Sequence, residues 1–225
     1  MNRRNLVKLL SLLGSALHPL ARAQSTDTAA STKHTVLSSD GTRIAYEVVG
    51  SGPALVLLHG LMGNRQSWHD SGYVAALAKD YRLLLVDLRG HGESAGPTDP
   101  AVYDYASLTA DIAAVVNQES DEPVALWGYS AGGGLAMACV AHYPELFSKV
   151  VIGGSYRAAI GFPEGATEGM VANARRIGTM ATLPAADIPA NMRGQNIAAI
   201  AAFLEKGSYF DPQVQARLKQ FTRPA

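Results

Sequence analysis

The arrangement of apolar and polar residues along the chain predicts two kinds of β-strand. Two stretches, residues 34–37 and 43–49, flank a turn made of Ser39, Asp40 and Gly41, and together they predict a β-hairpin. The continuous apolar run of residues 54–58, bounded by Gly52-Pro53 and His59-Gly60, predicts a strand that is buried on both faces. Residues 82–86, 124–127 and 150–152 are predicted to be three further strands.

Segments with a helical pattern separate the four apolar strands. They cover residues 65–79, 104–117 and 130–143, so each strand-helix-strand unit takes roughly 30 residues. This alternation predicts an α/β fold in which a mostly parallel central sheet is flanked by helices. We expect the core to span residues 33–156.

From residue 157 onward the pattern changes. Prolines separate short helical stretches at residues 168–180, 195–206 and 212–221, and we expect no strand there. The prolines are Pro163, Pro184, Pro189 and Pro212. Residues 157–225 are therefore expected to form either a helical cap over the core or a helical tail.

The first 23 residues have the three parts of a secretory signal peptide. Arg3, Arg4 and Lys8 are basic, an apolar stretch follows, and Ala21-Arg22-Ala23 is a small-x-small cleavage site before Gln24. The arginine pair resembles a twin-arginine export signal, with the general secretory route as the alternative. We expect an exported, periplasmic or secreted protein whose residues 24–32 form a flexible lead-in.

Composition narrows the class of protein further. The chain has 225 residues, 19 basic and 19 acidic, and a single cysteine, Cys139. The length predicts one domain, or one domain with a small insertion, and the charge balance gives no support for binding nucleic acid. We expect no internal disulfide, no metal, no cofactor and no membrane span in the mature chain, while the oligomeric state is left open.

Residues 127–133, WGYSAGG, carry the candidate chemistry. Ser130 has Gly128 and Gly132 two positions to either side, and the motif lies between a predicted strand and a predicted helix. Such a G-x-S-x-G turn is typical of a nucleophile elbow, in which the serine projects at the amino end of the following helix. Glycine is expected on both sides because larger side chains would collide in the tight turn.

Two more segments strengthen this interpretation. The run LVLLHGLMGN ends a buried strand in His59 and Gly60, and the backbone N–H groups of Leu61 and Ala131 would make an oxyanion hole above Ser130. The second segment, VDLRGHGESAGP, places a Gly-rich loop after the strand that ends at residue 86.

With these three motifs, residues 35–156 resemble the α/β-hydrolase fold family with a serine nucleophile. The resemblance implies Ser130 as nucleophile, Leu61 and Ala131 as oxyanion donors, and esterase-like hydrolysis of a small-molecule ester or other acyl substrate. It also implies that Asp87 and Arg89 hold their loop, and that His59 shapes residues 59–64, the predicted oxyanion loop.

The same resemblance implies a triad acid and a triad histidine after the sixth strand. No histidine follows His142, so both residues stay unassigned, with His59 and His91 as weak substitutes. We expect about six of the family's eight strands and a C-terminal truncation that impairs catalysis. We also expect residues 150–152 to become an exposed, aggregation-prone edge. The alternative is a non-catalytic binding or interaction protein on this fold.

Overall fold

The computed structural model describes residues 31–155, 166–189, 192–206 and 212–218. Within them, six strands form one sheet in the order β1-β2-β4-β3-β5-β6. The strands are β1 (Ser31–Leu37), β2 (Arg43–Val49), β3 (Ala54–Leu58), β4 (Arg82–Val86), β5 (Val124–Tyr129) and β6 (Phe147–Gly153). The pairs β3–β4, β3–β5 and β5–β6 are parallel, whereas β1–β2 and β2–β4 are antiparallel. The mostly parallel sheet predicted from the sequence is confirmed.

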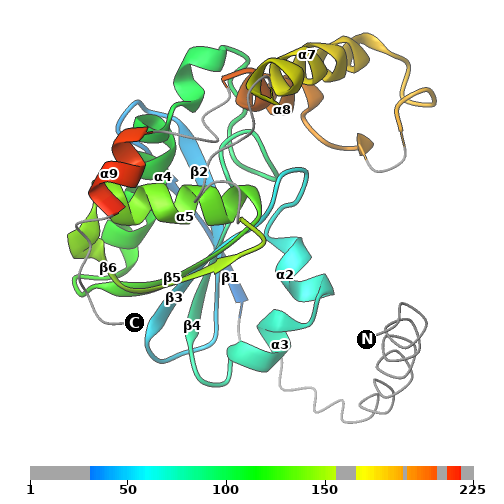
Figure 1. Cartoon of the computed structure of the whole chain (residues 1–225). Helices are drawn as coiled ribbons and strands as arrows, with labels where there is room; N and C mark the ends of the chain where they lie inside the picture. The colour runs from blue at the N-terminus through cyan, green and yellow to red at the C-terminus, as the bar shows by residue number, and fades with distance from the viewer. Residues whose placement is uncertain (1–30, 156–165, 190–191, 207–211, 219–225) are drawn as a thin grey trace, which may run out of the picture.

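Helices cover both faces of this sheet (Figure 1). They are α2 (Gln66–Asp70), α3 (Tyr73–Leu77), α4 (Tyr105–Glu119), α5 (Ala131–His142), α7 (Ala166–Thr179), α8 (Ile197–Lys206) and α9 (Pro212–Leu218). Short 3₁₀ helices span Pro100–Tyr103, Pro144–Leu146 and Met180–Thr182.

The central strands are apolar throughout because each face meets a different helical layer. In β3, Val56 and Leu58 pack with α4 and α5, while Leu55 and Leu57 pack with Trp68 of α2 and Val74 of α3. This explains why apolar and polar residues do not alternate in the β3 sequence ALVLL.

One predicted helix is wrong. Residues 65–79 form two short helices, α2 and α3, separated at Ser71 and Gly72. Gly72 has φ +80°, in the left-handed region that glycine adopts without steric cost, so the chain turns there and starts a new helix.

The C-terminal helices do not form one unit. In Figure 1, α7 and α8 lie side by side away from the sheet, whereas α9 lies beside α5. Val214 of α9 is buried against Ala138 and Ala141 of α5. Thus only α7 and α8 are placed as a cap would be, and α9 adds to the layer that covers the sheet.

Among the described residues, β6 pairs with β5 alone and forms an edge of the sheet. Its apolar residues are partly uncovered: Val151 is 51% exposed and Ile152 is 37% exposed. The other edge strand, β1, is exposed along most of its length.

Candidate active site

Ser130 sits where β5 ends and α5 begins. Its backbone has φ +52° and ψ −115°, outside the regions that ordinary residues favour. Two main-chain bonds hold it: the Ser130 N–H donates to Gly153 at 2.7 Å, and the Gly133 N–H donates to the Ser130 carbonyl at 2.9 Å. The hydroxyl of Ser155 donates to that carbonyl as well. The serine is thus held in a strained turn at a helix amino terminus.

The two flanking glycines are required by close backbone contacts. A β-carbon on Gly128 would lie 2.1 Å from the Gly132 carbonyl oxygen, which is well inside contact distance. One on Gly132 would lie 2.3 Å from the carbonyl oxygen of Leu58, the last residue of β3. These contacts bring the first turn of α5 against the end of β3.

The same contacts place the His59-Gly60 loop beside the elbow. A β-carbon on Gly60 would lie 3.2 Å from the Ser130 β-carbon. Ala131 is the first residue of α5, so its N–H has no partner within the helix. Leu61 directly follows Gly60, and the convergence of its N–H with that of Ala131 stays a prediction.

His59 is fixed by hydrogen bonds on both ring nitrogens. Its Nδ1 lies 2.8 Å from the Gly60 carbonyl oxygen, and its Nε2 accepts the Leu88 N–H at 3.1 Å. Burial, reinforced by neighbouring His91, lowers the pKa of His59 to about 3. The imidazole is therefore neutral, and it links the oxyanion loop to the loop after β4.

His91 is the second buried imidazole near this junction. Its Nδ1 lies 3.1 Å from the Arg89 carbonyl oxygen, and its ring meets His59 and Phe203 of α8 edge-on. Burial lowers the pKa of His91. Its Nε2 has no hydrogen-bond partner among the described residues.

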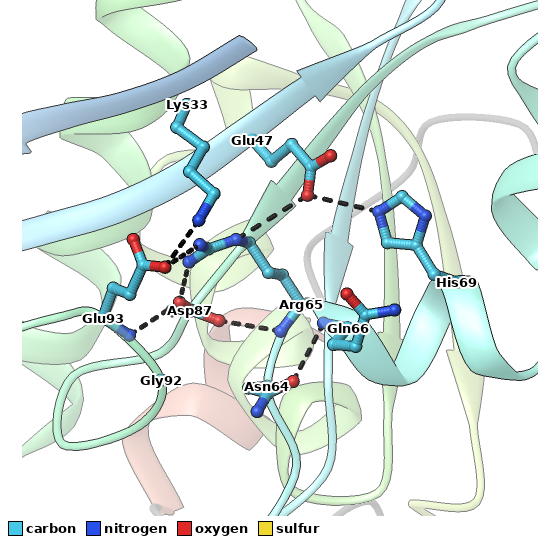
Figure 2. Close-up of a pocket in the computed structure, with 9 residues that line it drawn as sticks. All are labelled: Lys33, Glu47, Asn64, Arg65, Gln66, His69, Asp87, Gly92 and Glu93. Carbon is cyan, nitrogen blue, oxygen red and sulfur yellow. Dashed lines mark hydrogen bonds and ion pairs between the residues drawn. The ribbon is translucent and has the colours of Figure 1, made fainter. Parts of the chain in front are cut away.

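Asp87 supports the oxyanion loop from behind (Figure 2). Its carboxylate accepts the N–H of Arg65 at 2.7 Å and of Glu93 at 2.8 Å, and it pairs with the Arg65 guanidinium. The guanidinium also reaches Glu93 at 2.6 Å and Glu47 at 3.7 Å. These groups line a cavity of about 300 Å³, and Lys33, which also lines it, pairs with Glu93 at 2.8 Å.

Arg89 is completely buried and also has a structural role. It donates to both carboxylate oxygens of Asp111, at 2.9 and 2.6 Å, to Asp40 at 2.6 Å and to the Val102 carbonyl oxygen at 2.9 Å. The Gly-rich loop after β4 is thus tied to α4 and to the β1–β2 turn.

Helices α7 and α8 approach the site through the oxyanion loop. Leu61 and Met62 pack against a small apolar cluster of Ala174, Ile200 and Leu204. This packing joins α7 and α8 to the loop that precedes α2.

The remaining described histidines lie elsewhere. His34 of β1 stacks on Tyr46, His69 of α2 lies 3.2 Å from a carboxylate oxygen of Glu47, and His142 ends α5. Within the described ranges, no histidine or carboxylate is hydrogen-bonded to the Ser130 hydroxyl. His18 and the predicted signal peptide, residues 1–23, lie outside those ranges.

Three residues of this site were not anticipated from the sequence. Ser155 braces the elbow, Arg65 pairs with Asp87, and Met62 has φ +64°. Gly133 was a usable signal for the position of Ser155. A β-carbon on Gly133 would lie 2.7 Å from the Ser155 hydroxyl oxygen, so the close approach of Ser155 requires glycine there. Nothing local in the sequence marks Met62.

Three further features of the described part of the chain concern metal ions, membranes and the single cysteine. It holds no cluster of three His, Cys, Asp or Glu side chains that could bind a metal ion. In the same residues, no helix has both the length and the apolar character needed to cross a membrane. Cys139 is fully buried in α5, and that burial raises the pKa of its thiol, so the thiolate is disfavoured.

Comparison with known proteins identifies the class. The model of the family described as alpha/beta hydrolase fold matches residues 53–221, well over half of the chain. The protein belongs to the α/β-hydrolase fold family. A solved esterase from Exiguobacterium antarcticum superposes with a TM-score of 0.59 at 24% identity, over 79% of this chain and 73% of that one.

Curated relatives match about half of the chain. An uncharacterised protein of Mycobacterium tuberculosis is 36% identical over 113 residues, which are 50% of this chain and 32% of that protein. The 2-succinyl-6-hydroxy-2,4-cyclohexadiene-1-carboxylate synthase of Pectobacterium atrosepticum is 36% identical over 125 residues, 55% of this chain and 46% of the synthase. The match therefore spans less than half the length of either relative.

Proposed function

We propose that the protein is an exported, esterase-like serine hydrolase with Ser130 as nucleophile. The observation that carries this is the strained backbone of Ser130, at φ +52°, between the end of β5 and the first turn of α5. Strain of this kind is retained where the surrounding structure enforces it, and it is concentrated at functional sites. Similarity to the Exiguobacterium esterase supports the fold, whereas the Pectobacterium relative is named as a synthase.

In the proposed reaction, the Ser130 hydroxyl oxygen attacks the carbonyl carbon of an ester. The carbonyl oxygen becomes an oxyanion facing the N–H groups of Leu61 and Ala131, at the amino end of α5. Collapse of this intermediate expels the alcohol with a proton and leaves an acyl-serine. Water then attacks the acyl carbon and releases the carboxylic acid.

The hydroxyl proton needs an acceptor. His59 cannot take this role, because its Nε2 already accepts the Leu88 N–H and its Nδ1 is bonded to Gly60. We therefore propose that turnover by this chain is impaired, with the triad acid and histidine unassigned.

Ester hydrolysis tests this proposal directly. The full chain and its Ser130→Ala variant are assayed with p-nitrophenyl acetate and butyrate, with unfolding curves to show that both are folded. We expect slow hydrolysis that exceeds that of the variant. Equal rates for the two folded proteins would favour the alternative, a binding protein on this fold, and binding of a small acyl compound without turnover would support it.

Export is proposed from residues 1–23 alone. Replacing Arg3 and Arg4 by lysine should abolish export if the twin-arginine route is used. Export that continues in the double variant would indicate the general secretory route, and retention of the wild-type chain in the cytoplasm would contradict the export proposal.

A further inference from the structure

Met62 and Ser130 are the only two non-glycine residues with positive φ in the described part of the chain. Met62 lies at the third position of a turn that begins at Gly60 and is closed by the Gly63 N–H donating to the Gly60 carbonyl at 3.0 Å. A turn with positive φ only at that position favours Gly or Asn. Methionine is held there against its preference, so something outside the turn must hold it.

The contact that holds it comes from the helical segment. The Gln195 side-chain amide donates to the Met62 carbonyl at 3.0 Å, across 133 positions of sequence. Gln195 lies just before α8, where the next residue, Asn196, caps the helix by accepting the Ala199 N–H at 3.1 Å. Ile200 of α8 is fully buried in the cluster on which Met62 packs.

The turn also carries the predicted oxyanion donor. Leu61 is its second residue, and Gly60 at its start touches Ser130. If Met62 relaxed to negative φ, the peptide between Leu61 and Met62 would rotate, and the loop beside Ser130 would change shape.

We infer that Gln195 is a positioning residue that latches the strained Gly60–Gly63 turn beside Ser130 while α8 is seated. Packing of α7 and α8 against Leu61 and Met62 is then coupled to formation of the oxyanion loop. The role of the turn in catalysis rests on the proposed function, whereas the latch itself does not.

Amide hydrogen exchange at Gly63 in the full chain tests the latch without an activity assay. Gln195→Met keeps the length of the side chain but removes its donor. We expect Gly63 to exchange about fivefold faster, as for the loss of one intramolecular hydrogen bond, with α4 amides unchanged. Gln118→Ala, an exposed glutamine on α4, is the matched control and should leave Gly63 unaffected.

A double-mutant cycle separates latching from general stabilisation. Glycine adopts positive φ without strain, so in a Met62→Gly background Gln195→Met should change the Gly63 exchange less than twofold. An unchanged rate in Gln195→Met, or an equal effect in both backgrounds, would overturn the inference.

A second readout tells failure of the latch from failure of the proposed function. The rate at which a fluorophosphonate modifies Ser130 should fall in Gln195→Met in parallel with the change in exchange. Altered exchange without any modification of Ser130 in the wild type would contradict the proposed function and support the latch. If the fluorophosphonate modified wild-type Ser130 but Gln195→Met left the exchange of Gly63 unchanged, the proposed function would be supported and the latch contradicted.

Discussion

The two sides of β5 meet very different surroundings. On one side, β3, β5 and α5 approach so closely that Gly128, Gly132 and Gly60 have no room, or almost none, for a side chain. On the other side, β6 pairs through its backbone, yet Val151 and Ile152 remain exposed. The contrast teaches that the proposed nucleophile is fixed by tight backbone packing and buried ion pairs, while the neighbouring edge tolerates change.

The largest expected effect comes from the ion pairs behind the oxyanion loop. Arg65→Ala leaves Asp87 buried without its charge partner, which should cost about 3–5 kcal/mol of unfolding free energy. Urea unfolding measures this cost. Lys33→Ala, which removes an exposed partner of Glu93, is the control and should cost less than about 1 kcal/mol. A similar loss of unfolding free energy in Arg65→Ala and Lys33→Ala would contradict the claim that the buried ion pairs fix this side of β5.

Gly132→Ala tests the backbone contact with β3. The new β-carbon would lie 2.3 Å from the Leu58 carbonyl oxygen, so we expect about 3 kcal/mol of destabilisation. Gly169→Ala is the matched control, because Gly169 lies on α7 with open space around it. There alanine should stabilise the protein by about 0.5–1 kcal/mol. If both changes were neutral in thermal unfolding, the close packing at the elbow would be refuted.

The sequence predicted most of this region correctly. Continuous apolar runs predicted the strands β3, β4, β5 and β6, and the motif around Ser130 predicted a turn between a strand and a helix, which is where the residue lies. These features could be predicted because each depends on residues adjacent in the chain.

Contacts between distant segments could not be predicted in the same way. The bond from Gln195 to Met62 spans 133 residues, and Arg65 pairs with Asp87 across 22. The break at Gly72 was missed because a single glycine does not by itself end a helical pattern. Likewise, the apolar residues of β6 look the same in sequence whether a further strand covers them or not.

The buried histidines predict a pH dependence of stability. The pKa of His59 falls from its ordinary 6.5 to about 3 in the folded protein. The unfolded chain therefore binds this proton below pH 6.5, while the folded chain does so only near pH 3. Stability is full above that window and falls as the pH drops, by about 2 kcal/mol for His59 between pH 7 and pH 5.

Urea unfolding at pH 7 and pH 5 checks this prediction in the wild type and in His59→Asn. Asparagine does not titrate, so the difference between the two pH values should shrink by about 2 kcal/mol. The same difference in both proteins would show that His59 is not buried as a neutral imidazole.

The smallest effect on stability is expected at the β6 edge. Val151→Lys places a charge on an exposed edge strand, and it should change the unfolding free energy by less than about 0.5 kcal/mol. It should also reduce self-association, because edge lysines hinder strand pairing between molecules. Leu37→Lys on β1, the opposite edge, is the matched control, with light scattering as the measurement. Equal self-association of Val151→Lys and the wild type would show that molecules do not associate through the β6 edge.

Residue-level mass spectrometry after long incubation with a fluorophosphonate tests the assignment of the nucleophile most directly. At pH 8 the full chain should gain a single adduct on Ser130, slowly if the proton acceptor is impaired, and folded Ser130→Ala should gain none. An adduct on another residue, or an unmodified Ser130 in the folded protein, would contradict the account.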